Sequence, residues 1–352
     1  MGKKLFPAEA LLVFAQQVLQ NAGVREDDSR TIADTLVCAD LRGIHSHGIG
    51  KLDQYLARVN AKVLDPAAQV EIERENPVTS VINAHNGFGQ AAARHAMELA
   101  LQKAGAYGIG MVLVNHSNHF GIASYYSLMA AERGFIGFAA TNASPGIAPF
   151  GAKEKLFGTN PISIAVPSKS SFPVVLDMSS SVVARGKVRQ ALAAGGEIPL
   201  GWARDRNGIP TTDPAEAIKG TLEPISGPKG SALALMVEIL CGVLASSAMP
   251  GEVRVITDTS GPCGTGHMLC AIDPSSFADS EQFLADMDET IARIKSLTPV
   301  NGEVFVPGEL EHLCAEKGRL EGIALKENAV SALSALSEKY GVPLIGEEGH
   351  DE

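Results

Sequence analysis

A short polar segment near residue 45 carries the residue types best suited to move a proton on a small anion. His45, Ser46 and His47 lie between two stretches whose apolar residues recur at helical spacing. Lys51 and Tyr55 follow His47 at intervals of four, which would place the three side chains on one face of a helix that begins near Ser46 or His47. An imidazole, an ammonium and a phenol beside a helix N-terminus, which favours anions, predict a site that holds a small carboxylate and transfers a proton.

The helix before this segment has recognisable ends. Asp27 or Asp28 is a suitable N-terminal cap, and apolar residues continue at helical spacing to about Leu41. Gly43 is expected to end that helix in a left-handed conformation. The histidines would therefore lie in a tight connection between two helices.

Four histidines fall into two clusters, His45 with His47 and His116 with His119. A zinc hydrolase is one hypothesis, because zinc sites often contain a His-x-His pair, although no acidic cluster nearby completes a ligand set. His45 is best interpreted as a structural residue. His119 lies in a polar loop that follows a predicted strand and precedes a predicted helix, a place where α/β sheets bind ligands.

Other polar segments are candidates for ligand contacts. Thr159 and Asn160 belong to a Phe-Gly-Thr-Asn-Pro turn and serve either a ligand or the turn's own backbone. Residues 177–179 close a predicted strand. Lys229 opens an apolar helix within Gly-Pro-Lys-Gly, which would bring a cation and free N–H groups to one phosphate. The segment around Lys187 is either part of a site or a solvated basic run.

One glycine motif resembles a dinucleotide-binding turn but lacks its partner. Gly87, Gly89 and Ala92 match GxGxxA, and a Rossmann site would need an acidic residue about 20 positions later. The next predicted strand is followed by Asn115 and His116 instead. We therefore interpret the motif as a turn and the start of an alanine-rich helix.

Helical and strand-like patterns alternate through the middle of the chain, which predicts an α/β layer structure. Residues 5 to about 72 are expected to be helical, and residues 179–227 to form a long surface excursion rich in Gly and Pro. Strands are expected at 78–82, 110–114, 135–141, 162–166, 174–176 and 267–272, and further helices at 91–104, 122–132, 231–245 (buried nearly all round), 279–297 and 327–340. The helical ends, 1–74 and 277–352, are expected to pack together as one discontinuous domain around an α/β domain at 75–276.

Composition narrows the class of protein. The chain has 352 residues and a net charge of -11, which argues against a nucleic-acid partner or an anionic membrane surface. It lacks an apolar run of membrane-spanning length and a signal-peptide pattern, and its 5 cysteines are scattered. We expect a cytoplasmic protein with reduced thiols.

Taken together, several segments resemble the malate/L-lactate dehydrogenase family that is distinct from the Rossmann lactate dehydrogenases. Each is short, and they occur in the family's order from about residue 5 to 325. They are Arg42-Gly43-Ile44-His45-Ser46-His47-Gly48, His119-Phe120-Gly121, Pro149-Phe150-Gly151-Ala152, Phe157-Gly158-Thr159-Asn160-Pro161, Asp177-Met178-Ser179, Gly186-Lys187-Val188, Pro228-Lys229-Gly230 and Pro307-Gly308-Glu309.

The resemblance implies an NAD- or NADP-dependent oxidoreductase, usually a homodimer, with a non-Rossmann cofactor-binding sheet. By similarity, His47 would be the acid/base and Ser46 its partner, while His119 would act in catalysis or contact the cofactor. Lys51, Tyr55 and Thr159 would face the substrate. The residues that would line the cofactor are His119, Phe120, Gly121, Ile122, Ala123, Asp177, Met178, Ser179, Lys229, Pro307, Gly308 and Glu309.

Two positions bear on the substrate. Most family members have arginine where this chain has Lys51, and a lysine offers a point charge rather than two parallel hydrogen bonds. The members that reduce cyclic imines have aspartate at the position of Lys187, so lysine there resembles the hydroxy-acid enzymes.

We therefore hypothesise reversible hydride transfer between NAD(P) and C2 of a small 2-hydroxy/2-oxo carboxylate of malate, lactate, sulfolactate or ureidoglycolate type. His47 would exchange the hydroxyl proton, Lys51 would anchor the carboxylate, and Lys187 would polarise the substrate oxygen. The alternatives are a reductase of cyclic imine carboxylates or keto sugar acids, the zinc hydrolase, and a non-catalytic protein that only binds the cofactor.

Overall fold

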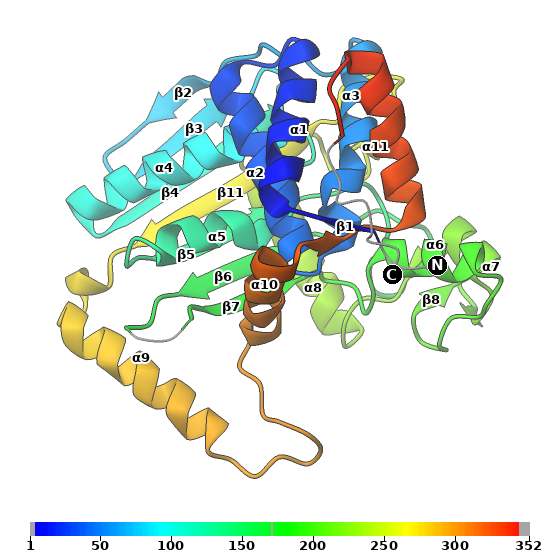
Figure 1. The fold of residues 1–352 in the computed structure, drawn as a ribbon. Helices are drawn as coiled ribbons and strands as arrows, with labels where there is room; N and C mark the ends of the chain where they lie inside the picture. The colour runs from blue at the N-terminus through cyan, green and yellow to red at the C-terminus, as the bar shows by residue number, and fades with distance from the viewer. Residues whose placement is uncertain (1–3, 170–171, 345–352) are drawn as a thin grey trace, which may run out of the picture.

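The computed structural model describes residues 4–169 and 172–344, which form a mixed α/β fold around one seven-stranded sheet (Figure 1). Across the sheet the strands are β2 (Glu71–Glu75), β3 (Thr79–Asn83), β4 (Ile109–Ser117), β11 (Thr265–Ile272), β5 (Ile136–Thr141), β6 (Ile162–Val166) and β7 (Val174–Met178). The pair β3–β4 is parallel, and every other neighbouring pair is antiparallel. A Rossmann sheet is parallel, so the expected non-Rossmann α/β class is confirmed.

The strands expected from β-rich runs are all present, but β2 was not predicted. The expectation of helix from residue 5 to about 72 is wrong at both ends. The chain begins there with β1 (Leu5–Phe6), and after α3 (Leu52–Asn60) it is not helical before β2 starts at Glu71. All of β2 is exposed, and it pairs only with β3 at the edge of the sheet. Charged side chains suit such an edge because they discourage pairing with another chain, and they remove the apolar alternation that would reveal a strand.

The helices α4 (Gly89–Tyr107) and α5 (Ala123–Ala131) pack against the sheet and against each other (Figure 1). The GxGxxA segment leads into α4, as interpreted from the sequence. A side chain at Gly89 would lie 2.1 Å from the carbonyl oxygen of Asn118, so this glycine allows α4 to approach the loop that carries His119. Alanines of α4 fill the layer between helix and sheet. The motif is therefore explained by packing.

Both ends of the chain contribute to a second hydrophobic core. The helices α1 (Ala8–Asn21), α2 (Glu26–Leu41) and α3 share this core with α11 (Glu327–Tyr340), whose Leu333 and Leu336 are buried in it. The short strand β1 (Leu5–Phe6) pairs with β12 (Ile323–Ala324). An additional helix that the sequence did not reveal, α10 (Glu309–Glu321), packs against α2.

The predicted helix after the sheet is present as α9 (Ser280–Lys295). It extends away from the terminal helices, and its main helical neighbour is the short η4 (Pro274–Ser276) (Figure 1). The expected domain boundaries at residues 74 and 276 stay a prediction. No helix among residues 4–169 and 172–344 has both the length and the apolarity needed to cross a membrane.

The expected surface excursion is in fact a small folded unit. It contains α6 (Arg185–Ala193), α7 (Pro214–Lys219) and a three-stranded sheet of β10 (Thr221–Leu222), β8 (Ala203–Arg204) and β9 (Pro210–Thr211). Its apolar residues are too sparse in sequence to show a period. They nevertheless converge into one core, formed by Val183, Val188, Ile198, Ala203, Ala217 and Leu222.

The apolar helix expected at 231–245 is α8 (Pro228–Val237) continued by the π-helical turn η3 (Glu238–Val243). The expectation that it is buried nearly all round is wrong. Met236 is 49% exposed and Leu244 is 56% exposed. The helix covers the sheet with one side only, which an apolar sequence does not disclose.

Candidate active site

A buried carboxylate organises the segment that carries the first pair of histidines. Asp40, near the end of α2, accepts hydrogen bonds from Nδ1 of His45 at 2.8 Å and from the backbone N–H of Ile49 at 2.6 Å. A side chain at Gly48 would lie 2.2 Å from this carboxylate, so only glycine fits there. His45 therefore has the structural role expected of it, and Asp40 fixes the path of the chain through His47.

The helix before this segment, α2, ends as expected but begins differently. Gly43 adopts a left-handed conformation with φ +76° and ends α2, as predicted. The helix begins at Glu26 after Arg25, without a side-chain cap, so the expected cap at Asp27 or Asp28 is wrong. Both aspartates lie inside the first turn, where their charge favours the helix N-terminus.

The continuous helix expected from His47 to Tyr55 is also wrong. Residues His45–His47 and Ile49–Lys51 form two separate 3₁₀ turns, η1 and η2, joined by extended Gly48. The helix α3 begins only at Leu52, because the hydrogen bond from Ile49 to Asp40 pulls the chain out of helical geometry. His47 is consequently not at the start of a helix, yet the charge of Lys51 acts on it and Tyr55 bonds to its neighbour His119.

The two predicted catalytic histidines lie against each other. The rings of His47 and His119 are stacked, with centroids 5.4 Å apart and planes inclined by 20°. Ser46 Oγ lies 2.9 Å from Nδ1 of His47, and the Tyr55 hydroxyl lies 2.7 Å from Nδ1 of His119. The structure thus brings together four residues from two segments that are well separated in sequence.

The hydrogen bonds of His119 determine its tautomer. The backbone N–H of Gly121, which can only donate, points at Nδ1 of His119 over 3.3 Å. Burial raises the pKa of Tyr55, so its phenol stays protonated and also donates to Nδ1. Neutral His119 must then carry its proton on Nε2, which leaves that N–H as a donor for a ligand.

Both imidazoles are held in the neutral form. Desolvation, with the nearby Lys51 ammonium, lowers the pKa of His47 to about 4. Desolvation and the neighbouring His47 lower the pKa of His119 well below its usual value. The pKa of each ring therefore lies below the ordinary histidine value. Both rings act as neutral hydrogen-bonding groups until a ligand changes their surroundings.

The remaining histidines of the two clusters face elsewhere. His45 binds Asp40, and His116 lies 2.9 Å from the Asn115 side chain. Within the described ranges 4–169 and 172–344, no three His, Cys, Asp or Glu side chains group closely enough to hold a metal ion. The histidine clusters thus lack the ligand set on which the zinc-hydrolase hypothesis depends.

The loop after His119 is fixed by a stack of rings. Phe120 lies between Tyr126, at 4.9 Å, and His267, at 4.7 Å between ring centroids. His267 is itself held by Ser117 and Thr141. The predicted cofactor residue Phe120 is therefore a buried support, while Ile122 and Ala123 lead into α5.

Three of the predicted cofactor residues surround one cavity of about 380 Å³. Asp177, Pro307 and Gly308 line it, together with Arg42 and Ser124. Asp177 accepts a hydrogen bond from the backbone N–H of Ser124 at 3.0 Å, which joins the end of β7 to the start of α5. The strand-end position predicted for Asp177 is correct.

This cavity contains polar atoms that lack protein partners. Arg42 as a residue is 9% exposed, its guanidinium makes no hydrogen bond or ion pair with other residues in the described ranges, and its Nε is fully buried. The Ser124 hydroxyl is also buried beside Asp177 and forms no hydrogen bond of good geometry with any residue that the structure describes. Burying a cation without a partner is costly, so these atoms indicate a place for an anionic or polar ligand.

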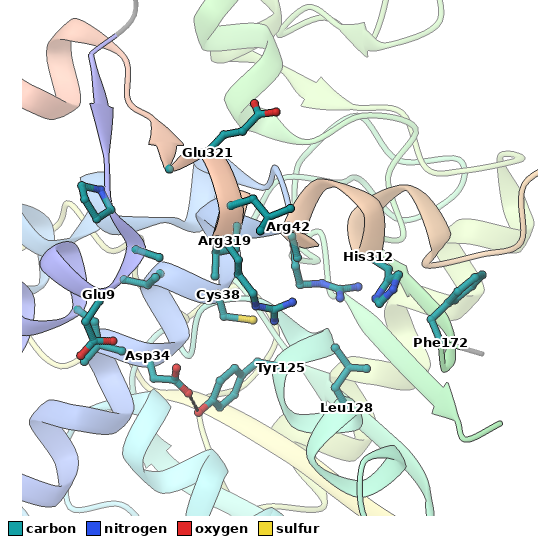
Figure 2. Close-up of a pocket in the computed structure, with 18 of the residues that line it drawn as sticks. Glu9, Asp34, Cys38, Arg42, Tyr125, Leu128, Phe172, His312, Arg319 and Glu321 are labelled. Carbon is teal, nitrogen blue, oxygen red and sulfur yellow. Dashed lines mark hydrogen bonds between the residues drawn. The ribbon is translucent and has the colours of Figure 1, made fainter. Parts of the chain in front are cut away.

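A larger cavity of about 820 Å³ adjoins the first and shares Arg42, Val175 and Gly308 with it (Figure 2). Figure 2 shows the guanidinium groups of Arg42 and Arg319 directed into it. On its floor the Tyr125 hydroxyl donates to Asp34 over 2.6 Å. Arg42 thus reaches a continuous space between α2, α5 and α10.

Other predicted cofactor residues have their own contacts. Glu309 accepts from Lys295 at 2.5 Å and from the Val306 backbone at 2.9 Å, so its carboxylate supports the Pro307–Gly308 turn. Ser179 bonds to Ser181. Met178 is half-buried at the end of β7, and Lys229 is exposed at the start of α8.

The Phe157–Pro161 turn is built by a buried glutamate. Glu238 in η3 accepts hydrogen bonds from the backbone of Gly158 at 3.0 Å and from Asn160 at 2.9 Å. Asn160 also accepts from the Ala143 backbone, so this residue serves the turn. Thr159 is half-buried, and its side chain is not engaged in that network.

The segment that contains Lys187 lies beside the histidines. A side chain at Gly186 would be 3.8 Å from Cβ of Ser46, so the first turn of α6 abuts the η1 turn. Lys187 itself is exposed. Sequence reasoning overlooked Arg42, Ser124 and Arg189, although Arg42 belongs to a quoted segment and Arg189 directly follows one. Their significance depends on neighbours from other parts of the chain.

Comparison with known proteins places this geometry among dehydrogenases. A family model described as malate/L-lactate dehydrogenase matches residues 6–334. A malate/(S)-sulfolactate dehydrogenase of Methanothermus fervidus is 40% identical over 328 residues, covering 93% of this chain and 96% of that protein. A ureidoglycolate dehydrogenase (NAD(+)) of Escherichia coli K12 is 33% identical over 323 residues, covering 91% and 92%. The name of a further relative specifies NADP(+).

A solved structure agrees with the fold. Sulfolactate dehydrogenase from Methanocaldococcus jannaschii superposes with a TM-score of 0.91 at 38% identity, covering 97% of this chain and 98% of that chain. The likeness extends over the sheet, the terminal helices and the folded excursion alike, since almost the whole of both chains is aligned.

Proposed function

Since the chain belongs to the malate/L-lactate dehydrogenase family, we propose that it is an NAD(P)-dependent oxidoreductase that interconverts a small 2-hydroxy carboxylate and its 2-oxo form. The observation that carries this proposal is the pairing of His47 with His119 beside the Lys51 ammonium. A proton acceptor, a neutral donor and a cation are the three groups that such a substrate needs. The nicotinamide supplies the hydride chemistry when it is bound.

His47 is the proposed acid/base. Its Nδ1 can donate to Ser46 Oγ at 2.9 Å, which frees the lone pair on Nε2 to accept the hydroxyl proton during oxidation. In the reverse direction the same atom returns the proton to the substrate oxygen. Ser46 holds the ring in the required tautomer.

His119 is the proposed electrophilic partner. Because Gly121 and Tyr55 both donate to its Nδ1, its Nε2–H is available to the substrate oxygen or to the cofactor. A neutral imidazole can stabilise a developing alkoxide without itself giving up the proton. Tyr55 therefore contributes by orienting His119, and Lys187, on the turn beside Ser46, is a further proposed contact for the substrate oxygen.

Lys51 is the proposed anchor for the substrate carboxylate. Among the described residues its ammonium bonds only to the side chain of Gln54, at 3.1 Å, and burial lowers its pKa. An anionic substrate would relieve that desolvation and would also raise the pKa of His47. Thr159 is placed on the substrate side by family resemblance.

The cavity beside Asp177 fits the far end of a dinucleotide. Arg42 offers an unpaired guanidinium and Ser124 a buried hydroxyl, both suited to phosphate or ribose oxygens. Lys229 and the free N–H groups of α8 are a second proposed phosphate contact. The relatives' names include both NAD(+) and NADP(+), so either cofactor is admitted.

The Arg42 assignment leads to a binding prediction. Arg42→Met should weaken binding of NADH or NADPH about ten- to hundredfold, the effect of losing a charge-assisted hydrogen bond. The melting temperature of the free protein should stay level or rise, because the variant no longer buries an unpaired cation. Fluorescence titration and thermal melting measure the two effects. A lower melting temperature with unchanged cofactor affinity would make Arg42 purely structural.

A substrate panel tests the proposed function itself. Purified protein should oxidise NADH or NADPH with oxaloacetate, sulfopyruvate or pyruvate, and should run in reverse with the corresponding hydroxy acids. Turnover confined to cyclic imines or 2-oxo sugar acids would replace the substrate class. A protein that binds NAD(P)H tightly yet turns over none of these compounds would be a binding protein instead.

The homodimer implied by the resemblance stays a prediction. The exposed apolar side chains of α8 and η3 are of the kind that a second subunit covers: Leu235, Met236, Ile239, Val243 and Leu244.

A further inference from the structure

The small folded unit at residues 179–227 contributes cations to the site. Its helix α6 begins beside Ser46, at the Gly186 contact of 3.8 Å. Arg185 fastens this end by donating to the backbone carbonyls of Ser144 and Pro145. A side chain at Gly146 would lie 2.2 Å from the Arg185 guanidinium, so the fastening is tight.

Arg189 lies one helical turn beyond Gly186. Residues three apart project from the same side of a helix, so Arg189 extends along the same flank that Gly186 presents to Ser46. Burial, and after it the positive charge of Arg189, lower the pKa of Lys51. Burial and then the charge of Arg189 also lower the pKa of Arg185.

Three cations thus converge without matching acids. Across the part of the chain that the structure describes, none of Lys51, Arg185 and Arg189 forms an ion pair, and Asp53 is the one carboxylate that offsets the charge at Lys51. Lys51 and Arg185 are partly desolvated and Arg189 is exposed, and like charges held close together repel each other. Such an arrangement is stabilised when a ligand brings in more than one negative charge.

The lysine at position 51 sharpens this argument. A lysine provides one point charge and cannot grip a carboxylate through two parallel hydrogen bonds, whereas an arginine can. Arg189, from the helix that begins beside Ser46, supplies the planar guanidinium that position 51 lacks. A substrate with a single anionic group would leave one of the two cations uncompensated.

We propose that Arg189 determines specificity by binding the second anionic group of a dianionic 2-hydroxy acid, a dicarboxylate or a sulfonated carboxylate, while Lys51 binds the first. This inference rests on the proposed function and narrows its substrate class. The acid/base chemistry of His47 is unchanged by it. Arg189 affects which substrate binds, so its removal should change KM more than kcat.

The test compares substrates that differ in the second charge. For the wild type, kcat/KM with oxaloacetate and sulfopyruvate should exceed that with pyruvate and 2-oxobutyrate. Arg189→Gln should lower kcat/KM for the dianions about ten- to hundredfold, mainly through KM, and should change the monoanion values by less than about threefold. Arg189→Lys should fall between the two.

A matched control removes the same charge from the same excursion. Arg206 is exposed and forms no ion pair among the described residues, so Arg206→Gln should leave the ratio of dianion to monoanion turnover unaltered. An equal loss for both substrate classes in Arg189→Gln would overturn the inference. So would an unchanged ratio.

A binding measurement separates this inference from the proposed function. Malonate and acetate are unreactive probes with two charges and one, and their affinities for the protein can be measured by calorimetry without turnover. Wild type should prefer malonate, and Arg189→Gln should abolish the preference. If no 2-oxo acid is reduced but this preference holds, the chemistry has been misassigned and the dianion site stands. If 2-oxo acids are reduced and the preference is missing, the dianion site is refuted.

Discussion

His47→Ala should lower kcat for hydroxy-acid oxidation by about 10²- to 10⁴-fold, the usual contribution of a positioned acid/base. The physical reason is that the hydroxyl proton would have to leave to water while the hydride departs. His47 is stacked on His119, and its Nδ1 is already bonded to Ser46, which leaves Nε2 for the hydroxyl proton. Cofactor affinity should change by less than about twofold, since the cavity beside Asp177 and Arg42 is formed by other elements.

The matched control for this prediction is two residues away. His45 belongs to the same 3₁₀ turn, but its Nδ1 is bound to Asp40. His45→Ala should therefore retain most of the activity, while Asp40 keeps the chain in place through Ile49. Stopped-flow and steady-state kinetics, with thermal melting of both variants, make the comparison. Near-normal turnover in His47→Ala would remove His47 from the chemistry.

Local patterns were sufficient to predict most of the fold. The strands β4, β5, β6 and β11 are short apolar runs buried in the sheet, and such runs are evident in a sequence. The edge strand β2 is charged and exposed, so it has no such signal. The exposed side of α8 and η3 likewise has no signal, because an apolar side chain does not reveal whether another element covers it.

The site was predictable where one segment carries the chemistry. His47, Ser46 and Lys51 are close in sequence, and His119 lies at a strand end, where ligands are expected. The helix that was expected to align them does not exist. Asp40, which lies 5 residues before His45 but which no local pattern distinguished, instead fixes the path of the chain through Ile49.

The residues that sequence reasoning missed acquire their roles from distant parts of the chain. Arg42 matters because β7 and α10 enclose it without a partner, and Arg189 matters because α6 folds back against Ser46. Neither fact follows from neighbouring residues. The lowered pKa of His47 is of the same kind, since it arises from burial and from the ammonium of Lys51.

That lowered pKa leads to a prediction for the pH dependence of the reaction. Reduction of the 2-oxo acid needs protonated His47, and kcat/KM reports the free enzyme. With a pKa of about 4, the protonated fraction falls about tenfold for each pH unit above that value. We therefore expect kcat/KM for reduction to fall steadily from about pH 5 to 7. For oxidation, kcat/KM should stay level over this range and fall only below about pH 4, because oxidation needs the neutral ring.

Lys51→Met tests the origin of this pH dependence, whose midpoint is set by the pKa of His47. Removing the ammonium eliminates one of the two causes that lower the pKa of His47. The pH at which kcat/KM changes should therefore move to higher values for both oxidation and reduction. The loss of the Lys51 ammonium as carboxylate anchor raises KM at every pH, but it does not by itself move the pH at which kcat/KM changes. A NMR titration of the His47 ring in the free protein should show the same displacement. Lys155→Met, at an exposed lysine outside the site, should leave both curves in place. If kcat/KM of the wild type instead changes around pH 6.5, the site leaves the pKa of His47 unperturbed. Burial and the charge of Lys51 would then not lower it.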